Sequence, residues 1–309
     1  MVRRWMPLLM AAAVLAFAGS SVPASASRIS PAVSVNGEVT SRSAYTSAQL
    51  AALPQTTATV TIGGRQFTDT GVLLETLVSD AEPAYPASLL NTKNELLRVT
   101  ATVRGAGHRK VSFAVGELDP GFGNPPALLA LTQNGRPVAD GPELVVPGDR
   151  APFRFVAGVS QVTVGIATAP ATDTTPPAGS PVEVIDGGHE VTLSSALLSR
   201  LPSETLTVSF EGPGGEQTHT EAGPSLLEVL AAAGVVPSFN TWVAAVGDDN
   251  YVATVTPAEQ FVGGRPLQLS LAEDGVVLAQ PRLVTDGDLK GGRYVSGVVD
   301  IYVGTGPAS

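Results

Sequence analysis

The stretch Leu144-Val145-Val146-Pro147-Gly148-Asp149, with the residues that follow it, decides the fold because a similar stretch, Leu283-Val284-Thr285-Asp286-Gly287-Asp288, recurs later in the chain. Residues 144–165 align without a gap with residues 283–304, with 10 identities in 22 positions. Residues 111–135 align in the same way with residues 251–275, with 6 identities in 25 positions. A repeat of this length predicts a tandem duplication of one structural unit.

Each predicted copy opens with a strand, over residues 33–37 and 182–187, followed by a short helix that ends in Leu-Pro. These helices start at Ser47 and Ser195, and we expect each serine to cap the helix start. The proline that follows ends the helix because it removes a backbone donor.

A hairpin and a second helix come next in both copies. Gly63-Gly64 in the first copy and the glycine-bearing segment 212–215 in the second each join two stretches of strand composition, which predicts β-hairpins. Leucines at helical spacing predict amphipathic helices over residues 71–78 and 223–233. Because β-branched stretches dominate the remainder, we expect an α+β fold: a β-rich mixed-sheet domain with short helices, duplicated in tandem.

The domain boundaries follow from composition. Residues 1–26 have the features of an export signal: Arg3 and Arg4, an apolar run and a small-residue cleavage site at 24–26. Residues 27–166 and 182–309 are the two copies, and residues 167–181, rich in Pro, Thr and Ala, form a predicted exposed linker. We therefore expect a secreted or extracytoplasmic, soluble product with no transmembrane segment in the mature chain, exported by either the general or the twin-arginine route.

Composition excludes several classes of protein. The 309-residue chain has no cysteine, which removes disulfide scaffolds, iron–sulfur centres and cysteine nucleophiles. Its three histidines have no metal-ligand spacing, and no G-x-S-x-G motif is present. The net charge of −10 makes nucleic acid a poor partner. The sequence predicts neither a catalytic residue nor a protein-ligated metal.

The order of motifs resembles the oxidoreductase molybdopterin-binding domain of the sulfite oxidase family, in two shortened tandem copies. The likeness is carried by V-x-G-x-V, a helix ending L-P, T-x-x-G-x-x-L-x-x-L, L-L-A-x-x-x-N-G-x-P and L-V-V-P-G-D. In the first copy these motifs cover residues 71–77, 128–137 and 140–149. In the second copy they cover residues 223–234, 271–278 and 281–295.

The resemblance implies a sulfite-oxidase-like fold that buries a molybdenum-bearing pterin, with one protein cysteine on the metal. The matching stretches here are residues 59–62 and 208–211, and neither contains a thiol. Ser209 would be a harder donor of higher pKa than a thiolate. Ordinary sulfite-oxidase chemistry is therefore not expected.

The resemblance also places cofactor-binding residues near the end of the second copy. Arg282, with Lys290, Gly291, Gly292 and Arg293, could hold an anionic cofactor through charge and glycine backbone. The first copy has Glu143 at the position of Arg282. His219, on a strand beside a helix start, is a further candidate. The alternative for residues 290–293 is a hairpin tip whose cations meet Asp286 and Asp288.

Three hypotheses follow from these observations. The first is an exported, non-catalytic binding or interaction module whose partner is a small anion or an envelope protein. The second is a divergent molybdopterin-dependent oxidoreductase that uses the C-terminal copy, with His219 or Tyr294 near the substrate. The third is a structural cell-envelope protein with two spaced domains.

Overall fold

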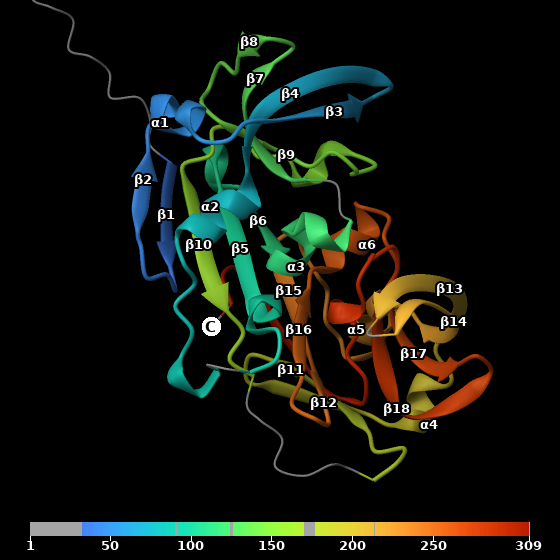
Figure 1. The fold of residues 1–309 in the computed structure, drawn as a ribbon. Helices are drawn as coiled ribbons and strands as arrows, with labels where there is room; N and C mark the ends of the chain where they lie inside the picture. Colours follow the sequence, from blue (N-terminus) through green and yellow to red (C-terminus); the bar gives the residue numbers. More distant parts are fainter. Residues whose placement is uncertain (1–32, 90–91, 124–125, 170–176, 213, 309) are drawn as a thin grey trace, which may run out of the picture.

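The computed structural model describes residues 33–89, 92–123, 126–169, 177–212 and 214–308. The predicted signal peptide (1–26) and residues 170–176 of the predicted linker lie outside the described residues. The chain forms two halves, and each half contains one mixed sheet and one antiparallel sheet with short helices between them (Figure 1). The described structure is β-rich α+β, as the sequence predicts.

The mixed sheet of the first half has five strands in the order β2-β1-β10-β5-β6. β1 runs parallel to β10, and the remaining neighbours are antiparallel. The bounds are β1 (Val33–Gly37), β2 (Ser43–Tyr45), β5 (Val99–Arg104), β6 (Lys110–Ala114) and β10 (Gln161–Ile166).

The second half repeats this arrangement as β12-β11-β19-β15-β16, with β11 parallel to β19. The other neighbours in this sheet are again antiparallel. The bounds are β11 (Val182–Asp186), β12 (His189–Leu193), β15 (Thr241–Gly247), β16 (Val252–Val255) and β19 (Val298–Thr305).

The antiparallel sheets also correspond in strand order. In the first half the order is β3-β4-β7-β8, with β9 paired to β7, and in the second half it is β13-β14-β17-β18. One long strand, β18, thus occupies the place of the short strands β8 and β9. The bounds are β3 (Thr56–Ile62), β4 (Arg65–Leu73), β7 (Leu128–Gln133), β8 (Arg136–Pro137), β9 (Glu143–Val145), β13 (Ser203–Gly212), β14 (Gly215–Pro224), β17 (Leu267–Glu273) and β18 (Val276–Thr285).

Each half carries three short α-helices within the described residues, one more than the sequence predicts. They are α1 (Ser47–Ala52), α2 (Leu74–Asp80), α3 (Val115–Leu118), α4 (Ser195–Leu198), α5 (Leu226–Ala232) and α6 (Pro257–Phe261). The prediction that Ser47 and Ser195 are the caps is wrong by one residue, because Thr46 and Ser194 accept the backbone N–H bonds at the helix starts. Single-turn 3-10 helices include η2 (Glu95–Arg98), η4 (Pro120–Phe122), η5 (Pro152–Arg154) and η6 (Gly291–Arg293).

The two halves share core residues. Leu97 and Phe122 belong to the first half by sequence but are buried in the hydrophobic cluster of the second half. Phe239 of the second half packs against the cluster of the first. The end of the chain returns to the first half, where the Ala308 N–H donates to Thr100 Oγ1 at 3.0 Å. The halves are therefore packed together directly.

The ends of the predicted linker are also packed. Ala167 is buried, and its N–H donates to the Arg98 carbonyl at 2.9 Å. The Gly179 N–H donates to the Ala279 carbonyl of β18 at 2.7 Å. At these two positions the chain is held against the body of the protein. None of the helices in the described part of the chain has the length and apolar character that crossing a membrane requires.

Candidate functional site

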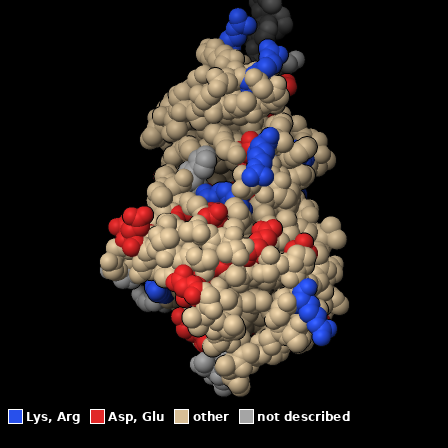
Figure 2. Space-filling view, turned by 90° about the vertical axis from the view of Figure 1, so that its right-hand side faces the viewer, with Lys and Arg blue, Asp and Glu red and all other residues tan. Residues whose placement is uncertain are grey.

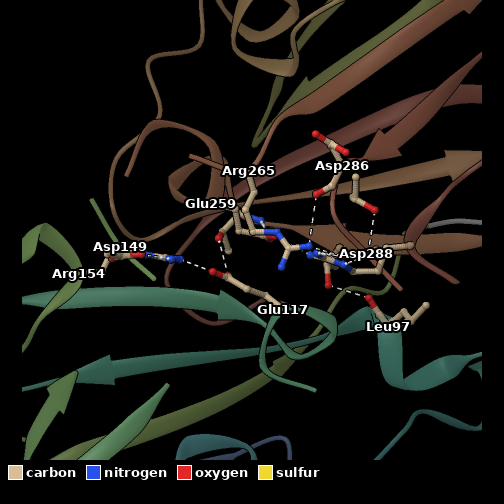
Figure 3. A network of polar contacts seen from close by, with 12 residues as sticks. Leu97, Glu117, Asp149, Arg154, Glu259, Arg265, Asp286 and Asp288 are labelled. Atoms are coloured by element: carbon tan, nitrogen blue, oxygen red, sulfur yellow. Dashed lines mark hydrogen bonds and ion pairs between the residues drawn. The ribbon is translucent and has the colours of Figure 1, made fainter. Parts of the chain in front are cut away.

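A buried ion-pair network lies where the two halves meet (Figure 3). In its first-half part, Arg154 of η5 lies between Asp149 and Glu117. Arg154 donates to Asp149 from Nε (2.9 Å) and from Nη2 (2.6 Å), and to Glu117 from Nη1. All three side chains are buried, so one guanidinium group is shared by two carboxyl groups inside the protein.

The second half contains the corresponding trio. Arg293 of η6 donates to Asp288 from Nε (2.7 Å) and from Nη2 (2.6 Å), and to Glu259 from Nη1 (2.7 Å). These three side chains are fully buried. Arg265 adds a further hydrogen bond to Asp288 Oδ1 at 2.7 Å.

Direct contacts join the two trios. Thr256, just before α6, donates from Oγ1 to Glu117 Oε2 at 3.0 Å. Thr254 donates from Oγ1 to the Leu97 carbonyl at 2.7 Å, and the Arg293 guanidinium lies 5.9 Å from the centre of the Phe122 ring. The network therefore fixes the two halves relative to each other.

Burial and neighbouring charges set the protonation of this network. Burial raises the pKa of Glu117 to about 7, with Arg154 opposing the shift and the Glu259 charge adding to it. Burial disfavours the charged form of Arg154 and Arg293, but the adjacent carboxylates outweigh this and raise the pKa of both guanidinium groups. Both arginines therefore remain charged and committed to internal partners.

Arg293, a predicted cofactor-binding residue, is thus fully buried with its guanidinium bound to Asp288 and Glu259. The Asp288 contact is one that the hairpin-tip alternative anticipated, although the side chain lies in the interior rather than in solvent. A ligand in solution does not reach this group.

Arg282 and His219 lie together on the antiparallel sheet of the second half. Arg282 Nη1 contacts Glu273 and donates to Glu221 Oε1 at 3.2 Å, and its Nε donates to Ser296 Oγ at 3.3 Å. His219 Nδ1 lies 3.0 Å from Asp274 Oδ2. Each of these two predicted binding residues already has an acidic partner.

Lys290, Gly291 and Gly292 lie in a cleft of about 700 Å³ between the halves. A Cβ atom at Gly291 would lie 2.8 Å from the Phe210 ring, and one at Gly292 would lie 3.1 Å from the Phe122 ring. The glycines therefore let two aromatic rings approach the backbone. Lys290 is exposed, and no ion pair to it is found among the described residues.

Aromatic and polar side chains from both halves line this cleft. Tyr251 bridges it, since its hydroxyl accepts from Asn94 Nδ2 at 2.8 Å and donates to the Gly292 carbonyl. The Lys93 ammonium lies 5.4 Å from the centre of the Tyr251 ring. The rings of Phe210 and Tyr294 lie 4.5 Å apart between centroids, tilted by 39°. Phe122, Asp119, Glu211 and Asp249 also line the cleft.

A second, smaller cavity of about 140 Å³ flanks the ion-pair network. Its wall is mostly apolar, from Phe113, Leu118 and Val146, with Glu117 and Arg154 at its polar end. The space-filling view in Figure 2 shows a hollow at mid-height in which basic side chains lie, with acidic side chains over the surface below it. Part of the positive charge of this face is therefore recessed, while other basic side chains project from the surface (Figure 2).

Sequence reasoning missed Glu117 and Glu259, which are each the third residue of a short helix, α3 and α6. The gapless alignment of residues 111–135 with 251–275 places Glu117 opposite Pro257. The hairpins before them have the same register, since Val103 pairs with Val111 and Ala245 pairs with Ala253. The first half has two more residues than the second between this glutamate and the next strand, so a gap of two residues after Glu259 would have aligned the two glutamates. Each of them follows a buried strand, which is a signal that the sequence carries.

Comparisons with known proteins add little. No protein-family model matches the chain, and no curated protein matches it. Among solved structures, the sulfane dehydrogenase SoxCD from Paracoccus pantotrophus matches with a TM-score of 0.34 and 16% sequence identity. That alignment covers 79% of this chain and 60% of the other, so the chain spans less than two thirds of that protein's length.

The residues present do not fit a molybdenum-bearing pterin. Arg293 and Arg282 are bound to internal carboxylates, and the sequence offers no thiolate for the metal. Ser209, on the strand where the family places its cysteine, shares a 2.8 Å hydrogen bond with Thr218 on an exposed face. No step of a molybdenum reaction is derived for this chain.

Proposed function

We propose that the protein is an exported, non-catalytic binding module, built from two shortened tandem copies of a sulfite-oxidase-type molybdopterin-binding domain. The corresponding strand orders of the two halves support the duplication. The absence of cysteine supports a role other than molybdenum turnover. In this proposal residues 27–166 and 182–309 are the two copies, joined by residues 167–181.

The binding site in this proposal is the cleft between the halves. Its size is within the range of small-molecule sites, about 300–1,000 Å³. The observation that carries the proposal is the position of Lys290 at the junction of both copies, beside four aromatic rings. None of the acids in the described ranges forms an ion pair with it. Aromatic faces bind planar ligands, and a lysine ammonium binds an anionic group.

A small planar organic anion is therefore the ligand class that the cleft favours. Asp119, Glu211 and Asp249 also line it, so a ligand with several negative charges would be repelled. This argues for one anionic group, placed near Lys290, and neutral donors elsewhere on the ring system.

The test is a titration of the purified full chain with pterin-6-carboxylate as the planar anion and sulfite as the small one, followed by calorimetry. We expect the planar anion to bind and Lys290→Gln to weaken it by roughly tenfold or more, the size of a lost charge-assisted hydrogen bond. Lys110→Gln is the matched control, because Lys110 is an exposed lysine that does not line the cleft. Equal losses in both variants, or no binding by the wild type, would contradict the proposal.

The oxidoreductase alternative has its own measurement. Stoichiometric molybdenum in protein exported by a molybdenum-replete native host would support that alternative and exclude the non-catalytic module.

A further inference from the structure

The antiparallel sheets of the two halves place different charges at equivalent positions. A Cβ atom at Gly71 would lie 1.8 Å from the Leu129 carbonyl oxygen, and one at Gly223 would lie 2.2 Å from that of Leu269. These two close approaches show that β4 corresponds to β14 and β7 to β17. Two residues before each glycine lie the acidic side chains of Asp69 and Glu221, both buried. The turns agree, since Asn134 and Asp274 accept from the backbone N–H groups of Thr68 and Thr220.

In the second half a cation neutralises the buried acid. Leu283 pairs with Leu269, and the next residue towards the N-terminus, Arg282, reaches Glu221 at 3.2 Å and also contacts Glu273. A guanidinium group therefore lies between the two carboxylates.

In the first half the corresponding positions hold no cation. Leu144 pairs with Leu129, and the residue before it is Glu143, which takes the place of Arg282. Gln133 takes the place of Glu273, and its Nε2 donates to Asp69 Oδ1 at 3.1 Å. Asp69 pairs with Gln133, and Glu143 pairs with Ala130 on the same central strand, so the three side chains belong to neighbouring positions of the sheet.

The carboxylate of Asp69 is incompletely satisfied. Asp69 is 1% exposed, and its Oδ2 has no hydrogen-bond partner among the described residues. Within the same residues no ion pair to Asp69 or Glu143 is found. Burial raises the pKa of both groups, and the charge of Asp69 adds to the shift at Glu143. Burying the charged carboxylates of Asp69 and Glu143 without a counter-ion costs folding free energy.

From the unpartnered Asp69 Oδ2 and the guanidinium that fills the equivalent place in the second half, we infer that the first half binds a hard divalent cation between Asp69 and Glu143. A cavity of about 480 Å³, lined by Gln133, Glu143 and Arg136 among others, gives access to Glu143, while the buried Asp69 is not part of its lining. Arg136 is exposed on its rim and has no ion pair to either acid.

The donor set selects the class of ion. Two carboxylates are hard oxygen ligands, which suit Ca²⁺ and Mg²⁺ rather than thiophilic or imidazole-binding metals. Water would complete the coordination, as is usual for sites with one or two carboxylates. Few protein ligands predict a modest affinity, with a Kd of about 10⁻⁴–10⁻³ M. This site is separate from the cleft between the halves.

The experiment uses the full chain after treatment with chelator and removal of the chelator. Calorimetric titrations with Ca²⁺ and, separately, with Mg²⁺ are combined with thermal denaturation at neutral pH. We expect saturable binding of one ion per chain and a rise in Tm of roughly 3 °C at ten times the Kd. The arm with the larger response identifies the preferred ion.

Three variants locate the ion. Asp69→Asn should weaken binding by at least roughly tenfold. Glu143→Arg copies the second half and supplies the guanidinium in place of the ion, so it should abolish the cation response and give a cation-free Tm at or above that of the wild type. Asp140→Asn is the matched control, since Asp140 is an exposed acid three residues before Glu143 that forms no hydrogen bond with Asp69, and it should respond like the wild type.

Each contrary result overturns the inference. No saturable heat and no Tm shift at 10 mM of either ion, about ten times the weakest expected Kd, would mean that the acids hold a proton or water only. A response that persists in Glu143→Arg, or that Asp140→Asn removes equally, would mean diffuse surface binding. Because Glu143→Arg is expected to be stable, loss of folding in Asp69→Asn does not prevent the test.

Discussion

At the scale of single residues, the molecule buries more charge than its low content of charged side chains suggests. Arg293 is fully buried and Arg154 nearly so, and each is held by a bidentate aspartate and a glutamate. Bidentate pairing and satisfied hydrogen bonds offset part of the cost of desolvating these ions. Arg293, which the resemblance assigned to an anionic cofactor, is therefore bound to carboxylates of its own half and packs against Phe122 of the other half.

Glu117 gives a pH-dependent prediction. Its pKa is raised by burial from 4.5 to about 7, so between these pH values the folded protein binds more protons than the unfolded chain. The stability contributed by this group is fully present below pH 4.5 and is lost as the pH rises through 7, with a slope of at most about 1.4 kcal/mol per pH unit. Glu117→Gln should flatten the decrease, as measured by denaturant unfolding at pH 5, 6 and 7.

Glu216→Gln provides the comparison, because Glu216 is an exposed glutamate near the β13–β14 turn. It should leave the pH profile unchanged. If Glu117→Gln keeps the wild-type slope, the pH dependence arises elsewhere and the assignment to Glu117 is incorrect.

At the scale of elements, strand and helix boundaries depend on close backbone approach. The sequence predicts helices over 71–78 and 223–233, but residues 71–73 belong to β4 and residues 223–224 to β14. The helices start at Leu74 and Leu226. The leucines of each motif do form a helix. The glycine at the start of each motif, Gly71 or Gly223, instead lies in a strand, where a neighbouring strand passes close to its backbone.

The close approach of Gly71 and Gly223 to neighbouring strands predicts that a larger side chain at either position destabilises the protein. A Cβ at Gly223 would lie 2.2 Å from the Leu269 carbonyl oxygen, and one at Gly71 would lie 1.8 Å from that of Leu129. Gly223→Ala and Gly71→Ala should each lower the free energy of unfolding by about 1–3 kcal/mol, because backbone must move. Gly188→Ala, where nothing lies within 4 Å of the added carbon, should be close to neutral in the same thermal and denaturant measurements. Equal effects at all three positions would contradict the steric argument.

At the scale of the whole molecule, the shared core predicts cooperative unfolding. Leu97 and Phe122 complete the hydrophobic cluster of the other half, and Thr256 is bonded across the junction to Glu117. We expect a single calorimetric transition for the full chain, with equal calorimetric and van't Hoff enthalpies. Residues 182–308 expressed alone should melt at a lower temperature than the full chain. Two resolved transitions, with the second half keeping its Tm when isolated, would indicate independent domains.

The sequence by itself determined the order of elements: the hairpins at Gly63-Gly64 and near Gly215, the short helices before Leu-Pro, and the β-rich α+β class. These features depend on local propensity and on patterns within a few residues, which the chain carries directly. It also identified Lys290, Gly291 and Gly292, three of the residues that line the cleft between the halves.

Only the tertiary structure decided which charges are available. In the sequence, Arg293 and Arg282 are equally good candidates for binding an anion. In the structure, Arg293 is buried between the halves, and Arg282 is bound to Glu221 and Glu273. The ion pairs of Arg293 with Glu259 and of Arg282 with Glu221 join residues far apart in the chain. A difference of two residues in the length of the segment after Glu117 and Glu259 hid the equivalence of these glutamates. The physical reason is that burial and pairing of a charge depend on what the rest of the chain packs around it, which no local pattern records.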